Sequence, residues 1–380
     1  MQFITRLSSL LSAMLLLAAC GASQSPLEAF PEEIYSPHYA TGFQIRGAAD
    51  RASTLITLSN PWQGAEQVQT HLLILRGGEQ APKGFTGQTL QGEAKRIVCM
   101  SSTHIALLDA IGEVERVVGV SGINFVSNPY VAQNKDRLGD VGYDGHIDFE
   151  LLLSLKPDIV LLYGIAGACT MEPKLQELGI PYLYIGEYLE EIPLGKTEWM
   201  LVLAELAGCR EKAEPIFAAI PKRYQALQER VAQSNRPRPK VMINTPYGDS
   251  WFMASATSYV ARLIADAGGD YLYQENHTNQ SLPIDLEEAM LLASEADVWI
   301  NVGNASTMAM LKRDLPKFAH VPCVVQGNVW NCNRRMNPSG GNDYWESGVV
   351  HPDLVLQDLI TIFHPELLPD SELTYYQQLQ

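Results

Sequence analysis

The chain carries one short pattern twice, and this internal repeat restricts the fold more than any other feature of the sequence. The first copy, residues 147–161, begins Ile-Asp-Phe-Glu, continues as a leucine-rich segment and reaches Lys-Pro-Asp-Ile-Val-Leu. The second copy, residues 284–300, begins Ile-Asp-Leu-Glu and ends in Ala-Asp-Val-Trp-Ile. Each copy predicts a helix with an Asp N-cap, followed by a buried strand. Two copies therefore predict two lobes built to one plan.

The length and patterning of the chain agree with two lobes. Its 380 residues exceed what one hydrophobic core usually holds. From residue 96 onward, short apolar runs alternate with helical patterns, which is typical of a parallel sheet covered by helices. We predict an α/β fold with two Rossmann-like αβα lobes, a long helical connector and an extra β-rich N-terminal segment. The predicted segments are residues 1–19 (signal peptide), 20–95 (tether and β-rich segment), 96–192 (first lobe), 193–239 (connector) and 240–380 (second lobe).

Individual elements follow from the same patterns. Strands are expected at residues 54–58, 71–75, 97–100, 117–120, 159–162, 182–185, 241–244, 298–302 and 323–326. Helices are expected at residues 102–111, 148–155, 172–178, 258–267, 285–293, 305–311 and 352–363. The connector is expected to be nearly continuous helix that Pro221 kinks or divides, because proline removes a helical hydrogen bond.

The first twenty residues have the pattern of a bacterial lipoprotein signal. Arg6 precedes an apolar stretch at residues 10–17, and Leu-Ala-Ala-Cys follows and ends at Cys20. The apolar stretch is too short to cross a bilayer as a mature helix, so removal of residues 1–19 is expected. Cys20 would then carry the lipid that anchors the chain outside the cytoplasm. The alternative is an ordinary signal peptide in which Cys20 has no role.

Charge and cysteine content exclude some classes of function. The formal net charge of −16 makes nucleic acid an improbable partner, because phosphate binding needs a basic surface. No second apolar run is long enough for a membrane span, so attachment would depend on the lipid alone. The cysteines lack Cys-x-x-Cys spacing, which disfavours a zinc site. Cys323 and Cys332 are near enough in sequence to pair, although separate buried thiols are the expectation.

The signal, the two lobes, the connector and the sequence Glu-x₅-Lys-Pro-Asp beginning at Glu150 together resemble one known family. This family comprises the solute-binding proteins of ABC importers for iron chelates, haem and cobalamin, and the resemblance covers about residues 95–363. It implies a monomer without a cofactor of its own that delivers a small metal chelate to a permease dimer. In that family a glutamate of each lobe meets permease arginines, and the matching positions here are Glu150 and Glu287. The alternative is that each glutamate only stabilises its helix dipole.

The ligand is expected off the carboxyl ends of the strands, where open α/β sheets place their crevice. By the resemblance, Tyr143 in Val-Gly-Tyr occupies the position of an iron-ligating phenolate in haem-binding members and of a corrin-packing aromatic in cobalamin-binding members. Tyr163, at the end of the strand 159–162, matches a further aromatic cleft position. A surface-loop tyrosine is the alternative for Tyr143.

In the second lobe, Tyr247 and Trp251 offer large aromatic faces to a flat ligand, and core packing is an equal alternative for Trp251. Arg334 and Arg335 have the guanidinium geometry that matches ligand carboxylates, although a solvated arginine pair is as reasonable. These residues favour haem or a ferric siderophore as the ligand, with cobalamin as the alternative.

Enzymatic activity is not expected. The sequence has no glycine-rich phosphate loop, no Gly-x-Ser-x-Gly and no His-Glu-x-x-His. A chelatase-like enzyme on a related fold and an adhesive surface lipoprotein are the two competing interpretations, and saturable binding of one small chelate would exclude the second.

Overall fold

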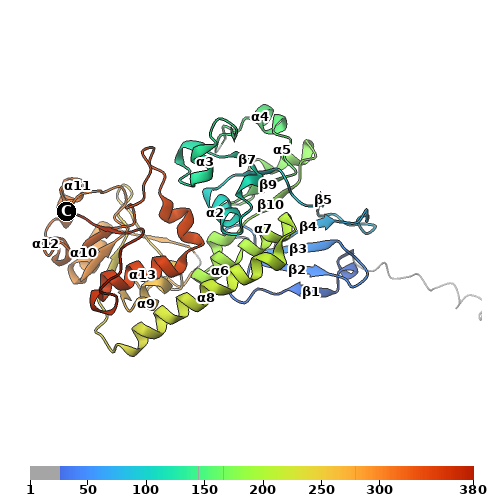
Figure 1. Cartoon of the computed structure of the whole chain (residues 1–380). Helices are drawn as coiled ribbons and strands as arrows, with labels where there is room; N and C mark the ends of the chain where they lie inside the picture. Colours follow the sequence, from blue (N-terminus) through green and yellow to red (C-terminus); the bar gives the residue numbers. More distant parts are fainter. Residues whose placement is uncertain (1–25, 144, 166, 279) are drawn as a thin grey trace, which may run out of the picture.

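The computed structural model describes residues 26–143, 145–165, 167–278 and 280–380. The predicted signal peptide and the lipidation at Cys20 lie outside the described residues. Two α/β lobes lie side by side above a long helix, α8 (Arg210–Gln233), and a separate sheet flanks the first lobe (Figure 1). Within the described ranges, no helix has both the length and the apolar character that a membrane crossing requires.

The first lobe is built on a five-stranded parallel sheet of order β10-β9-β6-β7-β8. All the residues of its central strands β6 and β9 are buried, which explains why these segments read as continuous apolar runs. The strands are β6 (Ile97–Cys99), β7 (Val117–Val120), β8 (Gly139–Asp140), β9 (Ile159–Leu162) and β10 (Tyr182–Tyr184). The helices are α2 (Ser102–Ala110), α3 (Pro129–Gln133), α4 (Phe149–Ser154) and α5 (Glu172–Glu177).

The second lobe repeats this plan with the order β13-β11-β15-β16-β17, in which only the last pair is antiparallel. Its strands are β11 (Lys240–Ile243), β13 (Asp270–Tyr271), β15 (Val298–Ile300), β16 (Val329–Asn331) and β17 (Gln377–Gln378). β12 (Trp251–Met253) and β14 (Leu282–Ile284) form a separate antiparallel two-stranded sheet. Its helices are α9 (Tyr259–Asp266), α10 (Leu286–Glu295), α11 (Met308–Asp314), α12 (Pro322–Val325) and α13 (Pro352–Phe363).

One predicted strand of the second lobe is wrong. Residues 323–326 belong mostly to helix α12, and the strand of this region, β16, begins at Val329. Pro322 occupies the first turn of α12, where its fixed φ favours a helix and its missing N–H costs nothing. A short apolar run cannot be assigned by periodicity alone, and here the proline decided the outcome.

The two copies of the repeat form matching structures. Asp148 caps α4 by accepting the N–H of Leu151 at 2.8 Å, and Asp285 caps α10 by accepting the N–H of Glu287 at 2.9 Å. The second Asp of each copy also has one role in both lobes. Asp158 accepts the N–H of Lys95 and Asp297 that of Lys240, both at 2.8 Å, so each carboxylate fixes the chain entering the first strand of its sheet.

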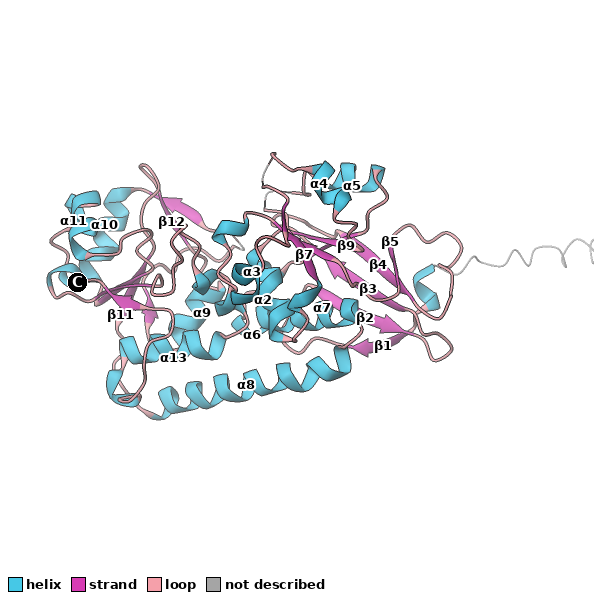
Figure 2. Ribbon diagram, turned by 45° about the horizontal axis from the view of Figure 1, so that its top comes forward, coloured by secondary structure: helices cyan, strands magenta, loops and turns pink. Residues whose placement is uncertain are grey.

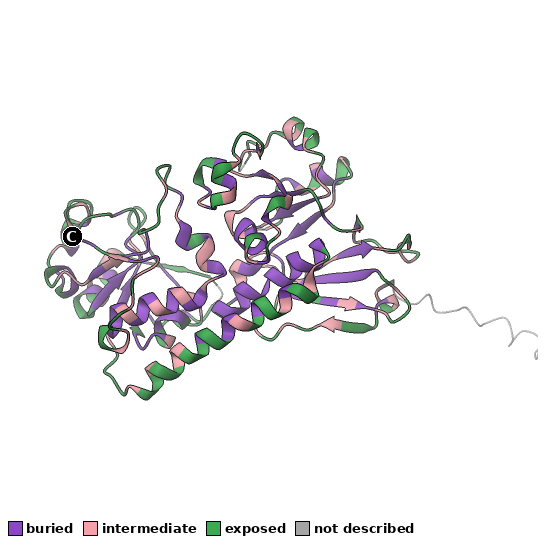
Figure 3. Cartoon of the chain, viewed as in Figure 1, coloured by how far each residue is buried: buried purple, intermediate pink, exposed green. Residues whose placement is uncertain are grey.

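The connector consists of three helices. α6 (Pro193–Glu198) and α7 (Met200–Ala207) precede α8. Pro221 does not divide the connector, because α8 continues through both Pro215 and Pro221. The break lies instead at Gly208, whose φ of 71° is left-handed and ends α7. At 24 residues, α8 is about 36 Å long. Figures 2 and 3 show it running beneath both lobes with an exposed outer face.

The β-rich N-terminal segment is confirmed as a sheet of order β1-β2-β3-β4-β5, in which only β4 and β5 are parallel. Its strands are β1 (Glu32–Tyr35), β2 (Phe43–Gly47), β3 (Thr54–Ser59), β4 (Gln69–Leu75) and β5 (Gln88–Gln91). Two buried connector carboxylates hold this sheet. Glu198 accepts the N–H groups of Tyr39 and Ala40 at 2.8 and 2.7 Å, and Glu190 accepts that of Thr41 at 3.0 Å.

Candidate ligand cleft

A cleft of about 440 Å³ lies between the two lobes, at the carboxyl ends of strands β6, β9 and β10. Its lining combines the first lobe, the connector helix α6 and the second-lobe helices α9 and α13. The lining residues are Ser101, Ser102, Thr103, Tyr163, Ile165, Glu187, Tyr188, Pro193, Lys196, Tyr259, Leu263, Tyr344, Trp345, Gly348, Val349, Pro352 and Val355. This is the position in which an open α/β sheet binds its ligand.

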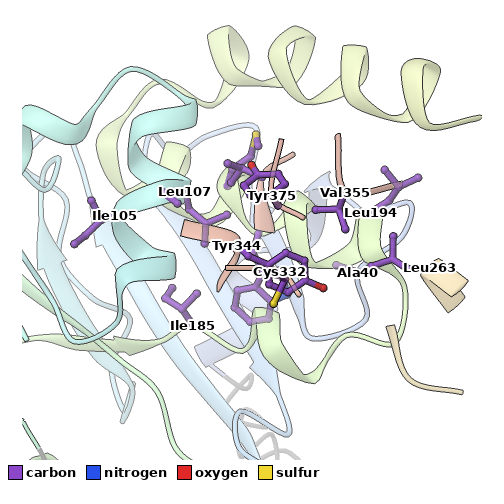
Figure 4. Packing of buried hydrophobic residues seen from close by; sticks show 14 of the residues in the cluster. Ala40, Ile105, Leu107, Ile185, Leu194, Leu263, Cys332, Tyr344, Val355 and Tyr375 are labelled. Carbon is purple, nitrogen blue, oxygen red and sulfur yellow. The ribbon is translucent and has the colours of Figure 1, made fainter. Parts of the chain in front are cut away.

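The lobes share one hydrophobic core below the cleft. Ile105 and Ile185 of the first lobe, Leu194 of the connector and Tyr344 of the second lobe belong to a single buried cluster. Figure 4 shows these side chains together, with Leu263 and Val355 nearby. Because this packing is continuous, the base of the cleft is a fixed surface rather than a gap between independent domains.

Aromatic side chains dominate the walls. Tyr163 and Tyr188 lie on the first-lobe side, and Tyr259, Tyr344 and Trp345 lie on the second-lobe side. Trp345 is 50% exposed, and its ring meets that of Tyr344 edge to face at a centroid distance of 4.7 Å. Rigid aromatic faces on both sides of an apolar cleft suit a flat ligand that fits between them.

The cleft tyrosines are held as neutral phenols. Burial raises the pKa of Tyr188 to about 12 and raises the pKa values of Tyr259 and Tyr344 still further. The Tyr188 hydroxyl also donates a hydrogen bond to the carbonyl of Gly164. These rings therefore offer faces and hydroxyl groups to a ligand, and ionising them for metal ligation is unfavourable.

Two buried ionisable side chains, Glu187 and Lys196, line this aromatic cleft. Glu187 is 3% exposed and Lys196 is 8% exposed. Burial raises the pKa of Glu187 and lowers that of Lys196, and the attraction between the two charges opposes both shifts. Lys196 Nζ lies 3.9 Å from the centre of the Tyr259 ring, a cation–π contact. Glu187 Oε2 is buried without a hydrogen-bond partner in the described structure.

The structure brings only part of the predicted site to the cleft. Tyr163, which the family resemblance assigns to the cleft, is among its lining residues. Tyr143 is 60% exposed and does not line it. Its neighbours Gly145 and Ile147 line an adjoining hollow of about 310 Å³ that also reaches Tyr163. Tyr247 is 84% exposed and lies outside both cavities.

Trp251 is a correction to the predicted site. Its side chain is fully buried in the second lobe, where it packs on Trp299 and Phe318 at centroid distances of 5.5 and 5.2 Å. Its indole N–H donates to the carbonyl of Ile243 at 3.0 Å. Trp251 lies on β12, whose alternating burial turns this side chain inward, so core packing and not ligand contact is its role in this structure.

The two arginines are a second correction. Arg335 pairs with Asp343 through Nε and Oδ2 at 2.9 Å and lies 5.7 Å from the centre of the Tyr375 ring. Arg334 is exposed, and neither guanidinium lines the cleft. The loop from Trp330 to Trp345 does reach the cleft, but it does so through its aromatic end. A ligand carboxylate in this cleft would therefore meet Lys196 rather than an arginine.

Several lining residues escaped the sequence reasoning. Lys196 lies in the predicted connector, and Glu187 lies just before it. Tyr259 is the first residue of helix α9, for which the sequence predicts no contact with a ligand. Lys196 lies in a helix whose residues are all buried, and only the structure shows this burial. A charge inside such a helix usually has a specific partner or role.

The predicted docking glutamates are both exposed. Glu150 lies in the first turn of α4 and Glu287 in the first turn of α10. Figure 1 shows these two helices on different lobes. Among the described residues, neither carboxylate forms a salt bridge.

The remaining chemistry of the chain is limited. Across the residues that the structure describes, no three His, Cys, Asp or Glu side chains are grouped to hold a metal ion. Cys323 and Cys332 are buried thiols that form no disulfide, in agreement with the expectation. Burial raises their pKa values to about 11 and about 12, which makes both unreactive.

Two α/β lobes, a rigid linking helix and an aromatic cleft at the ends of the strands define a bilobal binding protein. The family model described as periplasmic binding protein matches residues 97–335, which is more than half of the chain. The chain belongs to this family, and the resemblance inferred from its motifs is confirmed.

Individual relatives agree with this assignment. An uncharacterized lipoprotein of Methanocaldococcus jannaschii is 29% identical over 283 residues, which cover 71% of this chain and 65% of the relative. A cobalamin-binding protein of Halobacterium salinarum is 24% identical over 214 residues, which cover 56% of this chain and 55% of the relative. Among solved structures, a periplasmic haem-binding protein of Pseudomonas aeruginosa superposes with a TM-score of 0.57 at 19% identity. The match covers 76% of this chain and 98% of that chain, and it shows a shared fold.

Proposed function

We propose that this protein captures a flat metal chelate in the interlobe cleft and delivers it to the permease of an ABC importer. The observation that carries this proposal is a cleft with aromatic rings from both lobes in its lining and a few polar side chains among them. The names of the relatives support it, since they include a cobalamin-binding protein and a haem-binding protein.

The cleft favours a corrinoid over an iron chelate. The sequence-based preference for haem or a ferric siderophore depended on Tyr143 and on two arginines, and none of the three lines the cleft. Burial raises the pKa values of Tyr188, Tyr259 and Tyr344, three of the tyrosines that do line it, which disfavours their ionisation for iron ligation. Haem remains the second candidate, because the loop carrying Tyr143 borders the adjoining hollow.

Extracytoplasmic attachment completes the proposal. A lipid on Cys20 would hold the protein at the membrane that contains the permease, and the name of the Methanocaldococcus jannaschii relative includes the word lipoprotein. Labelling with a radioactive fatty acid in a bacterial host tests this point. The label should appear in the wild-type protein and disappear in Cys20→Ala.

Ligand titration tests the proposed function directly. The purified protein is mixed with cyanocobalamin, haemin and ferric siderophores, and binding is followed by tryptophan fluorescence and visible absorbance. Saturable one-to-one binding of cyanocobalamin is expected, with weaker binding of haemin. Binding of none of these chelates would reject the function, and tight binding of haemin alone would reject the corrinoid preference.

A further inference from the structure

The base of the cleft holds one acidic group and one basic group that the fold leaves available to a ligand. Glu187 Oε2 is buried and has no hydrogen-bond partner in the described structure, although Glu187 lines the cleft. Lys196 Nζ is stabilised by the Tyr259 ring and lies within salt-bridge distance of no described carboxylate. A buried polar atom without a partner costs free energy, so Glu187 Oε2 has hydrogen-bonding capacity to offer, and the ammonium group of Lys196 carries three N–H donors.

The surrounding residues fix both groups in place. A hydrogen bond from the Thr103 side chain engages the Glu187 carboxylate, while the ring of Tyr259 holds the ammonium group of Lys196. The charges of Glu187 and Glu190 both favour the protonated form of Lys196. Groups that are already oriented lose little entropy when a ligand binds, which makes such a pair effective in recognition.

The signs of the two charges restrict the ligand group that fits between them. A ligand carboxylate would attract Lys196 but would place a second negative charge against Glu187 in an apolar cleft. A ligand ammonium would have the opposite conflict. A primary carboxamide avoids both, because its N–H donates to Glu187 Oε2 and its carbonyl oxygen accepts from Lys196 Nζ.

We infer that Glu187 and Lys196 recognise one carboxamide substituent of the bound chelate and discriminate against the corresponding carboxylate. This inference rests on the proposed function, and it assigns the two residues as its specificity determinants. It accounts for a buried acid and a buried base in a cleft whose other lining side chains are uncharged.

The test compares cyanocobalamin with the monocarboxylic acids made by hydrolysing one of its side-chain amides at a time. The isomers are separated, and each is titrated against the wild-type protein by calorimetry at pH 7.5. At least one isomer should bind about tenfold more weakly than the parent, since it loses a hydrogen bond to a charged group and gains a repulsion. Equal binding of every isomer would overturn the inference while leaving the proposed function intact.

Two variants assign the discrimination to these residues. Glu187→Gln preserves the shape of the side chain but removes its charge, so the penalty on the acid isomer should fall below about threefold. Lys196→Met should weaken binding of the parent by about tenfold. Glu229→Gln and Lys222→Met, on the exposed face of α8, are the matched controls and should change neither value.

Two outcomes distinguish the role of Glu187 from the proposed function. Full discrimination in Glu187→Gln would overturn the assignment to this residue, with thermal melting used to verify that each variant is folded. Failure of the wild-type protein to bind either cyanocobalamin or haemin would overturn the proposed function and this inference together.

Discussion

The buried carboxylate of Glu198 provides much of the attachment of the N-terminal sheet. Glu198 accepts hydrogen bonds from the Tyr35 hydroxyl and from the backbone N–H groups of His38, Tyr39 and Ala40, at 2.6 to 2.8 Å. The connector therefore holds this sheet through the Glu198 carboxylate, each oxygen of which accepts two hydrogen bonds. Charge-assisted bonds of this kind are expensive to break, because several backbone donors lose their partner at once.

Glu198→Ala is expected to lower the free energy of unfolding by about 3 kcal/mol, since it leaves buried N–H groups unpaired. Urea denaturation measures the change. Tyr35→Phe removes only one of the four donors and should cost about 1 kcal/mol. A loss in Glu198→Ala no larger than that in the exposed control Glu229→Ala would contradict the role of this carboxylate.

Two tryptophans should separate binding from stability. Trp345 lines the cleft and is half exposed, whereas Trp251 is buried in the core. Trp345→Ala is expected to weaken cyanocobalamin binding about tenfold with little change in melting temperature. Trp251→Ala should destabilise the fold by about 3 to 5 kcal/mol. The reverse pattern, measured by calorimetric titration and thermal melting, would show that the cleft has been assigned incorrectly.

At the scale of elements, one segment of the second lobe bridges to the first. Asn337 donates to the carbonyls of Asn124 and Val126, each at 3.2 Å. Glu346, which is 2% exposed, accepts the N–H of Ser127 at 2.8 Å. These contacts join the segment that follows β16 to the loop that precedes α3. The lobes are therefore connected above the cleft as well as through α8.

This bridge should make stability depend on pH. Burial raises the pKa of Glu346 to about 7, and the charges of Asp343 and Asp109 act in the same direction. The folded protein thus holds the proton of Glu346 more tightly than the unfolded chain does. The stability that this proton contributes is complete below pH 4.5 and is lost as the pH rises through 7. The wild type should lose stability relative to Glu346→Gln over this interval, by about 3 kcal/mol at most. Parallel unfolding curves for the two proteins across pH 5 to 8 would exclude this effect.

At the scale of the whole molecule, the repeat places Glu150 and Glu287, both exposed, at matching positions near the start of a capped helix in each lobe. Glu150 and Glu287 have no salt-bridge partner in the described structure, and they are the positions that the family resemblance assigns to docking. A two-lobed protein can present such a pair to the two subunits of a permease at once.

Combining Glu150→Ala with Glu287→Ala should abolish uptake of the chelate in cells while leaving its affinity for the purified protein unchanged. Transport assays with labelled cyanocobalamin measure the first quantity, and calorimetry measures the second. A matched double variant, Glu229→Ala with Glu372→Ala, removes two exposed charges elsewhere and should transport normally. Normal uptake by the Glu150 and Glu287 variant would remove the docking role.

Local signals in the sequence were sufficient for most of the fold. The N-caps at Asp148 and Asp285 and the apolar strands beside them follow from interactions within a few residues, so the sequence alone predicts the duplicated plan. The exceptions also have local causes. Pro322 opened a helix where a strand was expected, and Gly208 rather than Pro221 ended a connector helix.

The sequence by itself determined two α/β lobes, a helical connector and a β-rich start, because periodicity, capping and turn chemistry act over short distances. Only the tertiary structure decided which side chains share the cleft. Glu187 and Lys196 are near each other in the sequence, but Trp345 belongs to the second lobe, and only packing of the two lobes against each other and against α6 brings the three together. Tertiary structure also decided that Trp251 is buried, since the face of β12 that turns inward depends on its pairing with β14.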